Sequence, residues 1–209
     1  MKIGIIGQGY VGTAIKVGFE SYYDLETYDK YSEEKSTMQL ADMVESCEVI
    51  FVCVPTPMNK DGSCNIDVVE GVIKQINKLL TDWKSDKKPI VVIKSTVPPG
   101  TTEKLHKKFK NVNVIFNPEF LTEANFIDDF KNQTRIILGG TRKGTNKLRQ
   151  IYSKVFPTAH IIKTHSTIAE LVKYMTNSYL ATKVSFANEM YQICEKFDMD
   201  YDKVVEYAT

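Results

Sequence analysis

The segment NPEFLTEANFIDDF, which begins at Asn117, places two carboxylates in apolar company. Glu119 and Glu123 are four residues apart, and Phe120 and Leu121 lie between them. A carboxylate that is partly surrounded by apolar side chains suits the role of a general base. The same carboxylates would also suit the N-terminus of a helix, where negative charge complements the helix dipole. The residue types alone leave both interpretations open.

The hexapeptide GQGYVG has the spacing G-x-G-x-x-G and stands between a predicted strand and a predicted helix. In that context Gly7 permits a tight turn, Gly9 lets a pyrophosphate approach the backbone, and Gly12 lets the helix pack closely. The phosphates would bind exposed N–H groups at the helix N-terminus, where Tyr10 and Val11 stand. The motif predicts a dinucleotide site, and a purely structural glycine turn is the alternative.

Asp29 ends the second predicted strand, in the sequence ETYDK. A carboxylate at this position accepts hydrogen bonds from an adenosine ribose and repels a 2′-phosphate, which favours NAD over NADP. The neighbouring Lys30 counts in the other direction, because a cation could accommodate that phosphate. The alternative is that Asp29 is simply a solvated strand end.

Two further strand ends break into proline-rich turns, VCVPTP and KSTVPPGTT. Ligands of a doubly wound sheet bind beyond the carboxyl ends of its strands, so Thr56, Ser95 and Thr96 are candidates to meet the cofactor or the substrate. Lys173 and Asn177 are four residues apart and would share one face of a mostly apolar helix. In each case an ordinary structural or solvent-facing role is the alternative.

The elements that must position these residues can be predicted from the sequence. Short apolar runs, typical of strands, alternate along the chain with segments whose apolar residues recur at helical spacing. The expected strands are 2–6, 25–28, 48–54, 89–96, 112–118, 135–140 and 160–165. The expected helices are 11–20, 36–46, 67–83, 101–109 and 145–156. This order predicts the α/β class, with a Rossmann-like, doubly wound parallel sheet and helices on both of its faces.

The pattern changes after residue 165. Residues 166–197 contain neither Gly nor Pro, and apolar residues recur along them at helical spacing. We expect one long α-helix here, which would begin a second, helical region; two helices with a bend are the alternative. A short helix is expected from residue 201 to the last residue, where the chain stops as if cut. The predicted domains are therefore 1–165 and 166–209.

The composition is that of an ordinary soluble globular protein. Of 209 residues, 43% are hydrophobic and 25% are charged, and the net charge of +1 gives no electrostatic basis for binding nucleic acid or a membrane surface. No apolar run is long enough for a membrane span, and glycines interrupt the opening MKIGIIGQG before a signal peptide could form. The four cysteines show no metal-binding spacing and suit a reducing compartment. We therefore expect a cytoplasmic protein without a metal.

Five motifs in this order resemble those of the UDP-glucose/GDP-mannose dehydrogenase family. They are GQGYVG, VCVPTP, KSTVPPGTT, NPEFLTEANFIDDF and AELVKYMTNSYLATKVSFANE. The resemblance covers essentially the whole chain. It implies a Rossmann domain followed by a long central helix used in dimerisation, and then a nucleotide-sugar domain. It also implies oxidation of a sugar C6 alcohol to a carboxylate with two NAD per sugar, through intermediates on a cysteine of the second half.

By the same resemblance, Glu119 lies beside the reacting C6 and assists hydrolysis of a thioester, while Phe120, Leu121 and Glu123 line the sugar-nucleotide site. Lys173 and Asn177 are implied to bind the reacting oxygen. A cation and an amide donor suit that task, because negative charge grows on the oxygen in the transition state. Thr96 would orient a catalytic water or the nicotinamide. Glu119, Lys173 and Asn177 would thus be both catalytic and substrate-binding residues.

The sequence departs from the family pattern at several places. Ala124 stands where a glycine is usual, and Gln133 and Thr134 replace the usual Pro-Asp before an arginine. The family's nucleophilic cysteine motif is not found in these residues, and Cys53 and Cys194 are expected to be small buried hydrophobes.

Three functions follow from these observations. The first is the N-terminal half of a UDP-glucose 6-dehydrogenase-like enzyme that leads to a uronic acid for polysaccharide biosynthesis; GDP-mannose is the alternative substrate. The second is a non-catalytic module that binds NAD and dimerises. The third is a small hydroxyacid-type dehydrogenase, against which the NPEFLTEANFIDDF segment counts.

Overall fold

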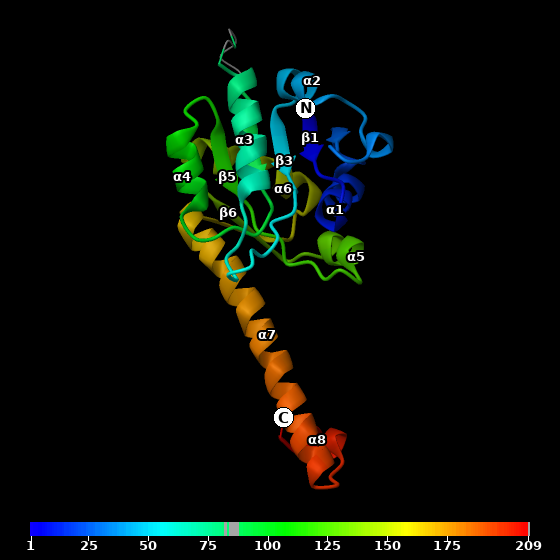
Figure 1. The fold of residues 1–209 in the computed structure, drawn as a ribbon. Helices are drawn as coiled ribbons and strands as arrows, with labels where there is room; N and C mark the ends of the chain where they lie inside the picture. The colour runs from blue at the N-terminus through cyan, green and yellow to red at the C-terminus, as the bar shows by residue number, and fades with distance from the viewer. Residues whose placement is uncertain (82, 84–87, 209) are drawn as a thin grey trace. The chain divides into compact units, whose positions relative to one another are not determined.

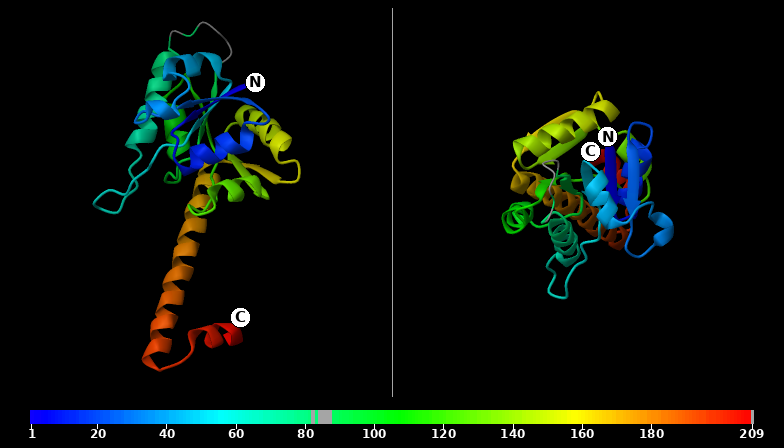
Figure 2. Two further views of the ribbon diagram at one scale, coloured as in Figure 1. Left: turned by 90° about the vertical axis from the view of Figure 1, so that its right-hand side faces the viewer. Right: turned by 90° about the horizontal axis from the view of Figure 1, so that it is seen from above.

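The computed structural model describes residues 1–81, 83 and 88–208 (Figure 1). The chain divides into two compact units, Met1–Lys173 and Tyr174–Thr209. The first unit holds a sheet and the helices on its two faces, which can be followed in two further views in Figure 2. The second unit consists of the continuation of a long helix and one short helix.

The elements alternate along the chain as the periodicity predicts. The strands are β1 (Lys2–Ile6), β2 (Asp24–Tyr28), β3 (Val49–Val52), β4 (Ile90–Ile93), β5 (Asn113–Phe116), β6 (Arg135–Gly139) and β7 (His160–Thr164). The helices are α1 (Tyr10–Phe19), α2 (Leu40–Ser46), α3 (Asp67–Leu79), α4 (Thr101–Lys108), α5 (Phe126–Lys131), α6 (Arg142–Val155), α7 (Ser166–Lys196) and α8 (Tyr201–Ala208), with a 3₁₀ turn η1 at Glu33–Lys35.

The seven strands form one sheet in the order β2-β1-β3-β4-β5-β6-β7. From β1 the chain crosses to β2 on one side and then returns to β3 on the other side, so the order reverses at β1. In such a sheet a crevice opens beyond the carboxyl ends of the strands at the reversal. The fold therefore directs a ligand to the ends of β1 and β3.

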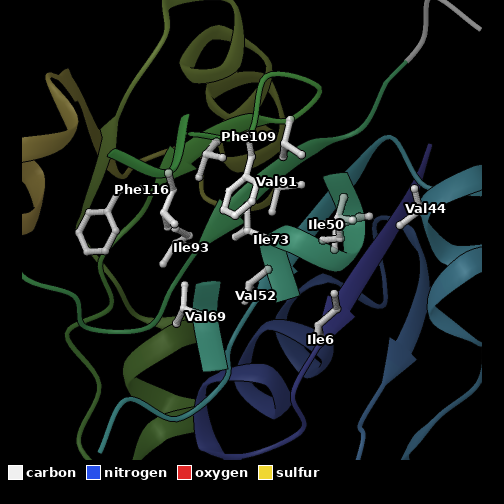
Figure 3. Close-up of a cluster of buried hydrophobic side chains, with 14 of the residues drawn as sticks. Ile6, Val44, Ile50, Val52, Val69, Ile73, Val91, Ile93, Phe109 and Phe116 are labelled. Atoms are coloured by element: carbon white, nitrogen blue, oxygen red, sulfur yellow. The ribbon is translucent and has the colours of Figure 1, made fainter. Parts of the chain in front are cut away.

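Helices cover both faces of the sheet, and each face has its own hydrophobic cluster. One cluster packs α2, α3 and α4 on the sheet and includes Ile6, Val44, Ile50, Val52, Val69, Ile73, Val91, Ile93, Phe109 and Phe116 (Figure 3). The other packs α1, α5 and α6 on the opposite face, around Phe19, Phe51, Phe130 and Tyr152. Strands buried on both faces explain the continuous apolar runs in the sequence.

The sheet departs from the predicted parallel arrangement at one place. β6 runs antiparallel to β5 and meets it at a single pair, Phe116 and Gly139, whereas all other neighbours are parallel. The connection from β5 through α5 does not cross back to the opposite edge of the sheet. As a result β6 starts beyond the carboxyl end of β5 and runs back toward it.

The helix predicted at 36–46 is shorter than expected and begins only at Leu40. The Thr37 hydroxyl instead accepts a hydrogen bond from the Thr27 amide of β2, and the Ser36 hydroxyl accepts one from the Asp29 amide directly after β2, each at 2.9 Å. Ser and Thr side chains that bind nearby backbone compete with helix formation in this way. Because β2 is an edge strand, the contact also satisfies polar groups that would otherwise be left unpaired.

Two other helix boundaries differ from the prediction. The helix expected to reach residue 83 ends at Leu79, and residue 82 of that prediction lies outside the described residues. α6 begins at Arg142 rather than 145, because Thr141 caps it by accepting a hydrogen bond from the Gly144 amide at 3.2 Å.

The residues predicted to form one long helix do so, since α7 runs unbroken from Ser166 to Lys196. α8 follows, and residue 209 of its prediction lies outside the described residues. Within the described part of the chain, no helix combines the length and the apolar character that crossing a membrane requires. The same residues contain no group of three or more His, Cys, Asp or Glu side chains that could hold a metal ion.

Candidate active site

The glycine-rich turn joins β1 to α1 at the reversal of the sheet. Gly7 has φ +89°, and a Cβ there would lie 2.6 Å from the Cys53 carbonyl oxygen of the neighbouring strand end. A Cβ on Gly12 would lie only 1.9 Å from the Gly7 carbonyl oxygen, so α1 packs directly on the turn. A Cβ on Gly9 would meet no atom within 4 Å. The turn is thus closed on its protein side and open at Gly9, as a cradle for a phosphate requires.

Asp29 closes the other side of the turn. Its Oδ2 accepts a hydrogen bond from the Gln8 amide at 2.8 Å, and its Oδ1 accepts one from the Tyr31 amide at 3.0 Å. Each carboxylate oxygen has a second lone pair, so the group retains capacity for hydroxyl donors. The position suits a ribose, and the role of Asp29 in binding NAD stays a prediction.

Three cavities lie at this edge of the first unit. The turn cavity, of about 400 Å³, is lined by seven of the predicted cofactor residues: Gly7, Gly9, Tyr10, Val11, Asp29, Thr56 and Thr96. The strand cavity, of about 300 Å³, shares Gly7 and Asp29 with it and adds Lys30. The Phe120 cavity, of about 400 Å³, is lined by Phe120, Leu121 and Arg135 among others. Gly12 packs within the turn itself.

Glu119 and Lys173 form an ion pair at this edge. The Lys173 ammonium lies 2.7 Å from Glu119 Oε1, and the side chains are only 6% and 14% exposed, respectively. Glu119 Oε2 accepts a hydrogen bond from the Leu121 amide at 2.7 Å. Because α5 begins only at Phe126, the interpretation of Glu119 as a helix N-terminal charge is wrong. The carboxylate instead holds a cation brought from the start of α7.

The ring of Phe120 contacts two cations. Lys173 Nζ is 5.7 Å from its centroid, and the Arg135 guanidinium carbon is 4.6 Å from it. Cation–π contact of this kind orients the ring and both cations. Glu123 is exposed, and Asn177 belongs to the second unit, so their places at a sugar site stay predictions.

Sequence reasoning missed Lys94, at the end of β4. Its side chain is 3% exposed, and its ammonium donates to Asn117 Oδ1 at 3.1 Å and to the Pro118 carbonyl at 3.3 Å. Burial lowers the pKa of Lys94 to about 8, despite the nearby Cys53 and Glu119, which act to raise it. The available signal was a lysine directly after four buried apolar strand residues, a position where a cation needs a partner.

Glu170 was also missed, although it stands three residues before Lys173. It is fully buried, and its carboxylate accepts hydrogen bonds from the Gly100 amide at 2.6 Å and the Thr102 amide at 2.7 Å. These amides are at the N-terminus of α4, so Glu170 caps that helix from α7. Burial raises the pKa of Glu170, while these hydrogen bonds act in the opposite direction. The bonds fix the first turn of α7, and with it Lys173, against the loop that carries Thr96.

Burial makes two of the cysteines, Cys53 and Cys47, poor candidates for an activated thiol. Burial raises the pKa of Cys53, which lines the turn cavity, to about 12, and that of Cys47 to about 11. Cys194 is 3% exposed and belongs to the second unit, as expected of a small buried hydrophobe. Because the thiolate is the nucleophile, Cys53 and Cys47 are unreactive at neutral pH.

Comparisons with known proteins bear on the family and the fold of this chain. Residues 24–156 match the model of the UDP-glucose/GDP-mannose dehydrogenase family NAD binding domain, and residues 167–209 match the model of its central domain. A UDP-glucose 6-dehydrogenase of Rickettsia prowazekii is 31% identical, over 94% of this chain and 52% of its own length.

Two solved structures are similar over nearly all of the chain. A UDP-glucose dehydrogenase from Pyrobaculum islandicum has a TM-score of 0.86 at 28% identity, and a GDP-mannose dehydrogenase from Pseudomonas aeruginosa has 0.86 at 25%. Each match covers 99% of this chain and 56% of the other. The chain thus spans about half the length of the relatives it matches.

Proposed function

This chain belongs to the UDP-glucose/GDP-mannose dehydrogenase family, and from that premise we propose that it supplies the NAD-binding half of a UDP-glucose 6-dehydrogenase. The enzyme would oxidise the sugar C6 alcohol to the uronic acid. The observation that carries the proposal is the largely buried Glu119–Lys173 pair beside the turn cavity. A module that only binds NAD has no need of a buried carboxylate and a buried cation at this place.

The first step under this proposal is oxidation of the alcohol to an aldehyde, which removes one proton and one hydride. The glycine-rich turn and Asp29 would hold NAD, which would supply the hydride acceptor, and the hydroxyl proton would pass to water. Lys173, with Asn177 one helical turn later, would stabilise negative charge on the sugar oxygen as the hydride leaves. Thr96, which lines the turn cavity, would position the nicotinamide or a water.

The second oxidation leads to the carboxylate and requires water. Glu119 would act there as the base that activates water for thioester hydrolysis, and Phe120, Leu121 and Glu123 would contact the sugar. The thiol that carries the thioester would come from the second half of the enzyme. Neither Cys53 nor Cys47 can supply it near neutral pH, because burial raises the pKa of both thiols.

We also propose that the enzyme is a homodimer formed through α7. Large apolar side chains are exposed along this helix in the second unit, namely Met175, Tyr179, Leu180, Val184 and Phe186. Sedimentation equilibrium at micromolar concentration should give twice the chain mass. A monomer across the whole concentration range would contradict the dimer.

The cytoplasm is the proposed location, with the uronic acid used in polysaccharide biosynthesis. All four cysteines are free thiols in the described part of the chain, which fits a reducing compartment. Recovery of the protein only from an oxidising compartment after cell fractionation would contradict this location.

The proposed activity predicts formation of NADH when the chain is given NAD and UDP-glucose, with GDP-mannose as a parallel substrate. The first hydride transfer needs no thiol, so a single turnover to the aldehyde is expected from UDP-glucose. Selective turnover of GDP-mannose would reassign the substrate. If the folded chain binds NAD and neither sugar nucleotide reacts, the alternative of a non-catalytic NAD-binding and dimerisation module is favoured.

A further inference from the structure

Two residues, Lys94 and Glu119, line both the turn cavity and the Phe120 cavity. They therefore form the wall between the space beside the glycine-rich turn and the space beside Phe120. If the proposed function holds, the hydride crosses from sugar to nicotinamide at such a wall. The side chains that set its shape and charge then matter for the reaction.

Glu119 is the part of this wall that faces Lys173, yet it stands on an irregular segment between β5 and α5. A carboxylate on such a segment needs a support. Lys94 provides this support, because its ammonium donates hydrogen bonds to Asn117 Oδ1 and to the Pro118 carbonyl. Asn117 and Pro118 are the two residues directly before Glu119.

Asn117 is in turn held on two other sides. Its Nδ2 donates to the Ile137 carbonyl of β6 at 2.8 Å, and its Oδ1 also accepts from the Tyr152 hydroxyl of α6 at 2.5 Å. All of these groups are buried. The network joins β4, β6 and α6 to the peptide that carries Glu119, and Lys94 is its only cation.

The charged and titratable groups that face Lys94 come from every element around it. They are Cys53 from the end of β3, Glu119 after β5, and Lys173 from α7, with Tyr152 of α6 reached through Asn117. Glu119 is the only carboxylate among them. The ammonium form of Lys94 is therefore needed both for strong bonds to Asn117 and Pro118 and for balance with Glu119, since charge-assisted hydrogen bonds are the stronger kind.

We propose that Lys94 is a positioning residue of the active site, whose ammonium holds the Asn117–Pro118 peptide and thereby fixes the Glu119 carboxylate in the wall between the two cavities. This role rests on the proposed function for its consequence in catalysis. The positioning itself is a property of the folded chain and can be measured without substrate.

The readout is the hydrogen bond from the Leu121 amide to Glu119 Oε2. The protection factor of the Leu121 amide against hydrogen exchange should be about tenfold lower in Lys94→Met. The reason is that the Asn117–Pro118 peptide, which positions the Glu119 carboxylate, loses its bonds to the Lys94 ammonium. Protection at core amides such as Ile5 and Phe51 should stay within about twofold. Lys78→Met, which removes an exposed lysine of α3, should change neither. Unchanged protection at Leu121, or an equal loss at all amides, would overturn the positioning role.

A second measurement uses the unsubstituted chain and covers the case in which Lys94→Met does not fold. The Lys94 side chain, followed by NMR, should titrate near pH 8, and the Leu121 protection factor should fall over the same range. Deprotonation of Lys94 weakens its bonds to Asn117 and Pro118, so the Leu121 protection factor should fall as the pH rises. A protection factor that stays constant while Lys94 titrates would contradict the proposal.

Binding of UDP-glucose and NADH separates this inference from the proposed function. Lys94→Met should weaken UDP-glucose binding about tenfold, because Glu119 no longer keeps its position beside Phe120. If the unsubstituted chain binds NADH but no sugar nucleotide, the proposed function fails in this chain, and the Leu121 exchange still decides the positioning role.

Discussion

Lys173→Met is expected to lower the rate of NADH formation from UDP-glucose by about 10²- to 10³-fold, which is the usual effect of removing one group that stabilises a developing oxyanion. Binding of NAD should stay within about twofold of the unsubstituted chain, because Lys173 does not line the turn cavity or the strand cavity. Single-turnover absorbance of NADH and fluorescence titration of NADH measure the two quantities.

The same substitution should also lower the free energy of unfolding by about 3 kcal/mol, since it leaves the largely buried carboxylate of Glu119 without its partner. The double variant Glu119→Gln/Lys173→Met should recover much of this loss, because no buried charge then lacks a partner. Lys104→Met removes an exposed lysine of α4 and serves as the control. An oxidation rate that survives Lys173→Met, with the chain folded, would contradict the assigned role.

Gly12→Ala is expected to abolish measurable NAD binding, with a loss of about a hundredfold or more. The new Cβ would lie 1.9 Å from the Gly7 carbonyl oxygen, and neither atom can rotate away, because the Cβ position is fixed by the Gly12 backbone and the oxygen is itself a backbone atom. The turn and α1 must separate, and a strained or opened turn no longer directs its amides at a phosphate. Isothermal titration with NAD measures the affinity, and chemical denaturation should show a loss of about 1 to 3 kcal/mol.

Gly9→Ala provides the matched comparison. Its Cβ meets no protein atom within 4 Å, and its φ of −81° suits any residue, so the free energy of unfolding should be nearly unchanged. NAD binding should still weaken, because the methyl group occupies the space through which the pyrophosphate approaches. Normal NAD affinity in Gly12→Ala would show that the turn does not hold the cofactor.

The sequence was sufficient to predict those parts of the fold that local pattern determines. Buried parallel strands are continuous apolar runs, and the turn from Gly7 to Gly12 depends on residues next to one another, so the doubly wound sheet and its glycine-rich turn were both predictable. The antiparallel direction of β6 was not predictable, because the direction of a strand depends on the path of the connection before it, here the one between β5 and β6. The short α2 was missed for a related reason, since Ser36 and Thr37 bind a strand rather than their own helix.

The residues of the candidate site likewise fall into those that the sequence made recognisable and those that it did not. Glu119 and Lys173 were recognised through motifs, and their contact is a pairing between residues far apart in the chain. Lys94, Asn117 and Glu170 were missed, because each owes its role to partners on other elements that no periodicity reveals. Buried polar residues in otherwise apolar strands and helices were the one available signal.

The bonds of Asn117 have a consequence for how long the folded domain lasts. They join segments around residues 94, 117, 137 and 152, which come together only when β4, β5, β6 and α6 are all in place. We expect these bonds to form after the folding transition state, in which case they slow unfolding and leave the folding rate nearly unaffected. The network that holds the candidate base in position would then also lengthen the lifetime of the native state.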